Sequence, residues 1–550
     1  MRAKHSRIDH PAGAFLNQRF VIYAIGKLLQ VLALVLCIPA LIAWFDLDRH
    51  SIPEALFDPR LAGFAASIIA SLLAGTLLIL FFGKKAGDFG GVKEGFAIVT
   101  FGWLLCTLFG SIPLFVYLLD KAQSVGPNSI ILGFTNAYFE IMSGFTTTGA
   151  TILTDIEILP RGILFWRSMT HWLGGMGIVT LALVFFPAFG VAAYQMFRGE
   201  VPGPSTERLR PRLGQTASIL WGVYFVLTLA ETILLMFGGM DWFEASCHAF
   251  GTMATGGFST KNASIAAYNS DYIDWVIIVF MFFAGMNFII HYRVLFHRDL
   301  SLIRTNSEFR FYVAVIVLAI VFGTSFKSIY RLAPEDAIKA SYRSGPLSRQ
   351  ELERKVAQEE YKQRSLYHTI RYVSFQVISI TTTTGYATAD FDMWPNILRV
   401  MLVVLMFFGG CAGSTGGGMK MIRVMTVLKS SWREVRTMIQ PRLILPVKIG
   451  GTAIEEKQVA NIAGFFVLFL LLFVFFSVVM SLMVPDFATA ITTVVATMCN
   501  IGPGLSGIGA TENYAWIPVI GKWVLIMCML LGRLEIYTVI IAFSPIAWKR

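Results

Sequence analysis

Four short polar segments, each containing glycine, are the parts of this 550-residue chain whose residue types and spacing point to chemistry. Their sequences are FTTTGAT at 145–151, TMATGGFS at 252–259, TTTTGYAT at 381–388 and MCNIGPGL at 498–505. The glycines that align in them are Gly149, Gly256, Gly385 and Gly502. Adjacent aligned glycines are roughly 107 to 129 residues apart, which indicates one structural unit repeated four times.

These residue types suit the binding of a cation. Glycine lets successive backbone carbonyl groups turn toward a common axis, and a ring of carbonyl oxygens can replace the hydration shell of a weakly hydrated cation. We therefore predict a selectivity filter that consists of Thr147, Thr148, Gly149, Thr255, Gly256, Thr383, Thr384, Gly385, Asn500, Ile501 and Gly502. The carbonyl groups expected to bind the ion belong to Thr148, Gly149, Thr255, Gly256, Thr384, Gly385, Ile501 and Gly502.

The elements that position these loops must lie in a membrane. The chain is 55% hydrophobic and only 14% charged, with a mean hydropathy of +0.65, whereas soluble proteins carry about a quarter charged residues. Runs such as 61–82 and 459–485 contain no acidic or basic side chain and are long enough to cross about 30 Å of hydrocarbon. The run 20–45 exceeds the length of a signal-peptide core and is predicted to be a retained helix.

The apolar runs predict ten crossings of the membrane. The expected spans are 20–45, 61–82, 95–119, 163–187, 215–238, 273–290, 309–329, 395–428, 459–485 and 520–544. The segments rich in lysine and arginine are 2–19, 84–93, 198–212, 293–310 and 420–457. They occupy every alternate connection, so the positive-inside rule places them and both termini in the cytoplasm. The same rule accounts for the net charge of +11, and binding of nucleic acid is not predicted.

Each polar loop follows a short amphipathic stretch on the outer side. These stretches are 132–144, 241–252, 366–379 and 486–498. As helices they extend only about 18 to 20 Å, too little to span the bilayer. Non-helical backbone at membrane depth is stable where it is buried in protein or faces water. We therefore expect re-entrant helices whose loops line an aqueous pathway, with the partly negative ends of the helices favouring a cation.

The predicted fold is thus an all-α integral membrane protein with four tandem repeats of helix, pore loop and helix around a central pore, preceded by two transmembrane helices. The expected units are 1–94 (N-terminal segment and two helices), 95–195, 196–300, 301–440 and 441–550 (repeats one to four). A charged outer insertion at 331–364 interrupts the third repeat. It is interpreted as a solvated segment or, alternatively, as a contact site for a partner.

A glycine-rich stretch interrupts the eighth predicted span. It contains Gly409, Gly410, Gly413, Ser414, Thr415, Gly416, Gly417 and Gly418. Each glycine weakens a helix by about 1 kcal/mol relative to alanine, so a break in the helix is expected there. Close packing of helices through small residues is an alternative interpretation. A phosphate-binding loop is disfavoured, because the motif G-x-x-x-x-G-K-[ST] is absent.

With these features, the sequence resembles the Trk/Ktr/HKT superfamily of potassium transporters, and its length and two additional N-terminal spans resemble the TrkH-type pore-forming subunit. The likeness covers about residues 15–550 and is strongest in the four loops and in FFGGCAGSTGGGMK at 407–420. Glycine at all four aligned positions implies potassium, because serine at the first position accompanies sodium transport in some plant members. The fourth loop departs from the pattern, since it lacks threonine. The resemblance assigns 409–418 as an intramembrane gating loop below the filter.

Arg533, in the last span near Glu535, is a further candidate. An ionisable group at that depth is a functional candidate by default, and the family has a basic residue at the matching place. We expect a barrier to cations that bonds to carbonyls of the gating loop, with a structural ion pair to a neighbouring helix as the alternative. Other intramembrane polar groups are interpreted as packing or anchoring residues: Glu140, His171, Glu231, Glu244 and His248.

The outer acidic residues Asp155, Glu157, Asp390 and Glu512 are predicted either to concentrate cations or to be solvated loop charges, and Lys261 opposes the first role. The six cysteines show no spacing that suits zinc or disulfides. No bound cofactor and no enzymatic activity are expected, and K⁺ is the transported ion. The leading prediction is a passive uptake channel, and the alternative is a symporter coupled to H⁺ or Na⁺. The resemblance implies a homodimer in the bacterial inner membrane with a cytoplasmic, TrkA-like nucleotide-binding regulatory subunit.

Overall fold

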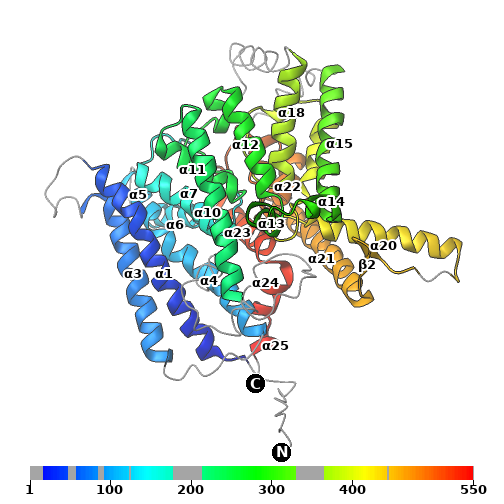
Figure 1. The fold of residues 1–550 in the computed structure, drawn as a ribbon. Coiled ribbons are helices and arrows are strands. Elements are labelled where there is room, and N and C mark those ends of the chain that lie inside the picture. Colours follow the sequence, from blue (N-terminus) through cyan, green and yellow to red (C-terminus); the bar gives the residue numbers. More distant parts are fainter. Residues whose placement is uncertain are drawn as a thin grey trace, which may run out of the picture.

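The computed structural model describes residues 16–47, 57–83, 92–122, 126–177, 213–329, 365–442 and 445–548. Figure 1 shows that this described part of the chain is mostly helical. In that view α1 begins near the lower end of the molecule, where the C-terminal α25 (Pro545–Trp548) also lies. The predicted insertion at 331–364 lies outside the described residues.

Two long helices precede the repeats, α1 (Gln18–Phe45) and α3 (Pro59–Phe82). They pack side by side along one edge of the molecule (Figure 1). Glycines at their contact allow this approach, because a Cβ on Gly26 would lie 2.9 Å from the carbonyl oxygen of Gly75. The pair is therefore held by close backbone contact through small residues, as is common between helices in membranes.

The described residues then show one order of elements four times: a long helix or helix pair, a short helix, a glycine loop and a further helix. The first repeat contains α4 (Val92–Gly110), α5 (Ile112–Asp120), α6 (Pro127–Phe145) and α7 (Arg161–Gly175). The second contains α10 (Leu213–Phe237), α11 (Trp242–Met253), η3 (Ser264–Tyr268), α12 (Asp271–Ala284), α13 (Phe288–His297) and α14 (Ser301–Thr305). The third contains α15 (Ser307–Ile329), α18 (Leu366–Thr381), η4 (Phe391–Met393), α19 (Asn396–Met406) and α20 (Met421–Ile439). The fourth contains the hairpin β1 (Lys448–Ile449) and β2 (Thr452–Ala453), then α21 (Glu456–Ser481), α22 (Phe487–Met498), η5 (Ser506–Ile508), α23 (Val519–Arg533) and α24 (Ile536–Phe543).

The helices α6, α11, α18 and α22 confirm the four predicted helical stretches, although α6, with 19 residues, is as long as α4. Three of them begin at a residue whose side chain accepts a hydrogen bond from the first turn, namely Asp241, Ser365 and Asp486. Such caps satisfy amide groups that have no partner within the helix. The first stretch was predicted too short, because α6 begins at Pro127, a residue that suits the first turn of a helix.

The last helix of each repeat ends or bends after the glycine loop. In the first repeat α7 ends at Gly175, and the remainder of the predicted span 163–187 lies outside the described residues. The predicted spans 273–290 and 520–544 are each a bent pair of helices in the structure: α12 and α13 meet at 104°, and α23 and α24 meet at 115°. The break predicted within 395–428 is confirmed, since α19 ends at Met406 and α20 begins at Met421.

Six described helices are long and apolar enough to cross a membrane, or eight if each bent pair counts as one span. The prediction of an all-α integral membrane protein is confirmed in class, while the number of ten crossings stays a prediction. α20 projects from the side of the molecule opposite to α1 and α3 (Figure 1).

Candidate ion pathway

The four glycine loops have the same backbone conformation. Each contains two left-handed residues separated by one residue. The first is Thr147, Thr255, Thr383 or Asn500, with φ between 53° and 61°. The second is Gly149, Gly257, Gly385 or Gly502, with φ between 78° and 96°. Such values suit glycine, because a side chain is strained there.

Backbone hydrogen bonds indicate the same alignment of the four loops as the left-handed residues do. The residue between the two left-handed positions donates its N–H to the carbonyl five residues earlier in all four loops. These bonds run from Thr148 to Ser143 (2.9 Å), Gly256 to Gly251 (2.8 Å), Thr384 to Ser379 (2.8 Å) and Ile501 to Ala496 (2.8 Å). The predicted alignment of Gly256 with Gly149 is therefore wrong by one residue. Gly257 is the equivalent of Gly149, and Gly256 is the equivalent of Thr148.

The second glycines place the four loops against one another in a closed ring. A Cβ on any of them would lie closer than 3.0 Å to a carbonyl oxygen of the next loop. The contacts run from Gly149 to Gly256, from Gly257 to Thr384, from Gly385 to Ile501 and from Gly502 to Thr148. Backbone therefore meets backbone around the whole ring, and no side chain fits between adjacent loops at this level.

A buried ion pair braces the outer ends of loops 145–151 and 252–259. Arg167 on α7 donates from Nε to Glu140 of α6 at 2.6 Å and from a terminal nitrogen to the carbonyl of Ser259 at 2.9 Å. Glu140 also accepts the N–H of Ile152 at 2.9 Å. Arg167 and Glu140 are 3% and 0% exposed. The pair thus links two loops that are far apart in sequence.

Polar groups at the same helical position brace the next two loops. His248 occupies the place of Glu140 in the second repeat and bonds through Nε2 to the hydroxyl of Ser259 at 2.9 Å. Gln376 occupies it in the third repeat, where its side-chain amide lies within hydrogen-bonding distance of Thr388. The interpretation of Glu140 and His248 as satisfied packing residues agrees with these bonds. Arg167 is not among the residues predicted from the sequence, although an arginine within a predicted span is the signal that identified Arg533.

We predict that Arg167→Met lowers both stability and ion discrimination. Removing one partner of a buried ion pair leaves an uncompensated charge and costs about 3 to 5 kcal/mol. The expected result is a lower melting temperature in detergent and a smaller ratio of K⁺ to Na⁺ flux. The matched control is Arg60→Met, because Arg60 pairs with Asp58 at a partly exposed site, 34% and 20% exposed, where ion pairs contribute about 0 to 1 kcal/mol. Equal effects of both variants would contradict this role.

The segment 407–420 lies against the inner ends of the loops and contacts three repeats directly. Thr415 donates its hydroxyl to the carbonyls of Met253 (2.9 Å) and Ala284 (3.2 Å), which end α11 and α12. The N–H of Gly417 bonds to the hydroxyl of Thr383 at 2.7 Å. A Cβ on Gly417 would lie 2.6 Å from the carbonyl oxygen of Cys499. Position 417 therefore requires glycine, because a side chain there would collide with the backbone at the end of α22.

Arg533 connects this segment to the remaining repeat. The guanidinium donates to the carbonyl of Thr415 at 2.7 Å and to the carbonyls of Gly174 and Gly175, at the end of α7, at 2.5 and 2.9 Å. Arg533 is the last residue of α23, directly before the bend to α24. The predicted bond to the glycine-rich segment is thus present, and the contact with α7 is an addition that the sequence did not indicate.

Comparison with known proteins assigns the family of this architecture. The chain matches the TrkH family, described as cation transport protein, over residues 61–549. The chain belongs to the TrkH family. The Trk system potassium uptake protein TrkH of Halomonas elongata is 35% identical over 97% of this chain and 100% of that protein. The Trk system potassium uptake protein TrkH of Escherichia coli K12 is 34% identical over 96% of this chain and 99% of that protein. The crystal structure of the potassium transporter TrkH from Vibrio parahaemolyticus superposes with a TM-score of 0.77 at 30% identity, covering 96% of this chain and 99% of that one.

In this TrkH-family protein the charged residues near the first two loops are engaged in hydrogen bonds or an ion pair. Asp155 and Glu157 accept hydrogen bonds from the side-chain amide and the N–H of Asn262, at 2.8 and 3.1 Å, and so join the first two repeats. Lys261 pairs with Glu244 at 2.8 Å. This hydrogen bond raises the pKa of the Lys261 amino group above its usual value. The positive charge of Lys261, which was expected to oppose cations, is therefore partly compensated by the negative charge of Glu244.

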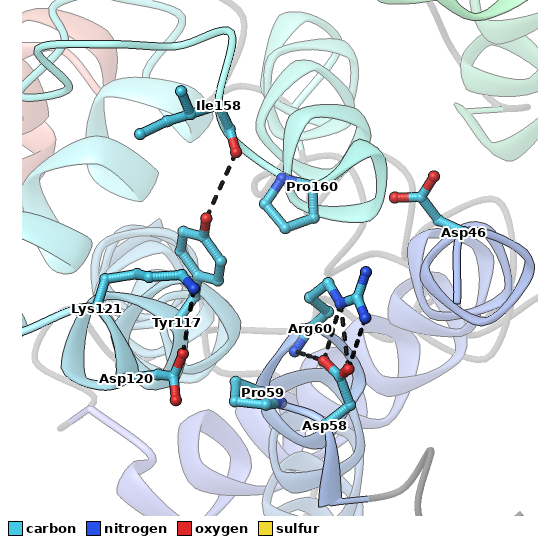
Figure 2. Close-up of a pocket in the computed structure, with 9 residues that line it drawn as sticks. All are labelled: Asp46, Asp58, Pro59, Arg60, Tyr117, Asp120, Lys121, Ile158 and Pro160. Carbon is cyan, nitrogen blue, oxygen red and sulfur yellow. Dashed lines mark hydrogen bonds and ion pairs between the residues drawn. The ribbon is translucent and has the colours of Figure 1, made fainter. Parts of the chain in front are cut away.

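A pocket of about 450 Å³ lies at the outer ends of α1, α3 and α5 (Figure 2). Its cations are paired with adjacent acids, Arg60 with Asp58 at 2.7 Å and Lys121 with Asp120 at 3.6 Å. Tyr117 reaches across it toward the carbonyl of Ile158 (Figure 2). None of the nine lining residues belongs to the four glycine loops. The pocket is a junction between the N-terminal helices and the first repeat of the TrkH fold.

Proposed function

We propose that this protein takes up potassium through a passive, K⁺-selective pathway along the axis of the four-loop ring. The observation that carries the proposal is the closed ring of backbone contacts from Gly149 to Gly256 and onward to Thr148. The names of the relatives, which are potassium uptake proteins of the Trk system, support potassium as the ion. Homology to a family of cation transport proteins also favours transport over catalysis.

The proposed ion ligands are two layers of backbone carbonyl groups, after correction of the register in the second repeat. One layer comprises Thr148, Gly256, Thr384 and Ile501, and the other comprises Gly149, Gly257, Gly385 and Gly502. Thr255 then belongs with Thr147, Thr383 and Asn500 at the next level. Rings of carbonyl oxygens compensate a weakly hydrated cation for its lost water, which favours K⁺ over the more strongly hydrated Na⁺.

We propose further that the segment 407–420 is the gate of the ion pathway and that Arg533 holds this segment in its closed position. The segment contacts α11, α12, α18 and α22 at the inner side of the ring, and Arg533 ties it to α7. A fixed guanidinium near the axis also opposes a passing cation, because like charges at about 4 Å repel by roughly 4 kcal/mol at an effective dielectric constant of 20.

The proposed setting is the bacterial inner membrane, with both termini cytoplasmic and two copies of this chain in a homodimer. A cytoplasmic nucleotide-binding subunit of the TrkA type is proposed as the regulator that opens the gate. The basic connections predicted on the cytoplasmic side would provide the docking surface for such a partner.

Flux measurements on the purified protein in liposomes test this function. K⁺ uptake that follows the K⁺ gradient alone, and exceeds Na⁺ uptake, is the expected result. Repeating the measurement with an imposed proton or Na⁺ gradient distinguishes the channel from a symporter. Uptake of K⁺ against its own gradient, driven by H⁺ or Na⁺, would refute the passive pathway.

A further inference from the structure

We propose that Glu308 is a positioning residue that fastens the segment 407–420 on both sides of its glycine-rich turn, residues 413–418, and thereby holds the gate closed. This inference rests on the proposed gating function of that segment. Glu308 lies at the start of α15, the first helix of the third repeat, and is 6% exposed. One of its carboxylate oxygens, Oε1, accepts the N–H of Ala412 at 2.7 Å and the N–H of Ile422 at 3.1 Å.

The two amide groups lie on either side of the glycine-rich turn. Ala412 precedes the turn, whereas Ile422 is in the first turn of α20. Amide groups in the first turn of a helix have no partner within the helix, and a carboxylate there is favoured by the helix dipole. A single acceptor therefore joins the backbone before the turn to the backbone after it and fixes both to α15.

Backbone pairing within the segment brings the same flanks together. Gly409 donates its N–H to the carbonyl of Met419 at 2.8 Å, and Met421 donates to the carbonyl of Gly410 at 3.2 Å. The Lys420 amino group bonds to the carbonyl of Gly416 inside the turn. These hydrogen bonds fix the conformation of the segment by joining its residues to one another. The hydrogen bonds to Glu308 differ because they attach the segment to α15, a transmembrane helix.

The position of Glu308 also connects its two hydrogen bonds with the predicted cytoplasmic side of the protein. α14 ends at Thr305, and Glu308 follows within three residues. That connection is part of the basic segment 293–310 predicted to face the cytoplasm. A displacement of the start of α15 would withdraw one oxygen from two amide groups at once, so a small movement outside the membrane would release both flanks of the gate.

Two substitutions separate the hydrogen bonds from the charge. Glu308→Ala removes the acceptor, and Glu308→Gln keeps a side-chain oxygen in the same place. In liposomes, Glu308→Ala is expected to raise basal K⁺ flux roughly tenfold, equivalent to about 1.4 kcal/mol in the equilibrium between closed and open gate. Glu308→Gln is expected to stay near the parent protein. The matched control is Glu455→Ala, because Glu455 is an exposed glutamate before the first helix of the fourth repeat.

A second measurement follows the segment directly. Cys411 lies within it and is 1% exposed, and Cys106, on α4 of the first repeat, is also 1% exposed. Release of the segment is expected to accelerate labelling of Cys411 by a small maleimide in Glu308→Ala, with Cys106 unchanged. Faster labelling of both thiols indicates general loosening of the fold and overturns the specific role of Glu308, and so does a Glu308→Gln variant that behaves like Glu308→Ala.

The outcomes keep the two proposals apart. Unchanged labelling and flux in Glu308→Ala, with increased flux in Arg533→Ala, would refute the clamp and leave the gate intact. Faster Cys411 labelling without increased flux would support the clamp and refute the gate. Unchanged results in both variants would refute both proposals.

Discussion

Replacing Arg533 with alanine is expected to raise K⁺ flux at least about tenfold. The substitution removes three bonds from a guanidinium to carbonyl groups of Thr415, Gly174 and Gly175. A hydrogen bond to a charged group contributes about 1.5 to 3 kcal/mol, and each 1.4 kcal/mol is a factor of ten in an equilibrium constant. The loss therefore favours release of the segment 407–420 and at the same time removes a positive charge from the pathway. K⁺ flux into liposomes with equal amounts of inserted protein measures the effect.

Arg533→Lys separates the two contributions of Arg533. Lysine keeps the charge but lacks the planar fork that reaches several carbonyl groups together. Flux close to that of the parent protein would assign the barrier to charge, whereas flux close to that of Arg533→Ala would assign it to the bonds with α7 and the segment. A stably inserted Arg533→Ala variant with unchanged flux would exclude Arg533 from gating.

Replacing Gly149 with serine is expected to reduce the ratio of K⁺ to Na⁺ flux by roughly a factor of ten or more, which corresponds to about 1.4 kcal/mol. Gly149 has φ +80°, and an added Cβ would lie closer than 3.0 Å to the carbonyl oxygen of Gly256. The carbonyl must therefore move, and the spacing of the ring changes at that junction. Gly257→Ser is expected to have the same effect, because Gly257 has φ +78° and approaches Thr384 in the same way.

Reversal potentials or paired K⁺ and Na⁺ fluxes in liposomes measure this discrimination. The matched control is Gly222→Ser on α10, because a Cβ there meets no atom within 4 Å. A Gly149→Ser variant that folds and keeps the discrimination of the parent protein would argue against a filter at this ring.

The loops and the short helices before them were predictable because local composition determines them. Thr-Gly dipeptides mark three of the four loops, and Asp241 and Asp486 mark the starts of α11 and α22. The register of the second loop was not predictable from the dipeptide. Its Thr-Gly dipeptide points to Gly256, whereas the backbone torsion makes Gly257 the equivalent of the other glycines.

The missed features depend on partners that are distant in sequence. The bend between α12 and α13 lies in an apolar run that looks continuous, yet the carbonyl of Gly285 accepts the N–H of Cys411, and Phe288 donates to Gly413. The role of Arg167 likewise depends on Glu140, and that of Glu308 on the amide groups of Ala412 and Ile422. Glycines 409–418 predicted the break between α19 and α20, but no local signal identifies the helices that the broken segment meets.

The ring of four loops is formed by one chain, and its four junctions differ in side chains although their backbones match. In a pore made from identical subunits, every substitution would be introduced at four places together. Here Glu140, His248 and Gln376 hold equivalent positions with different chemistry, so a substitution at one of them is introduced beside one loop and not beside all four. In the proposed filter, selectivity can therefore be adjusted in small steps, one junction at a time.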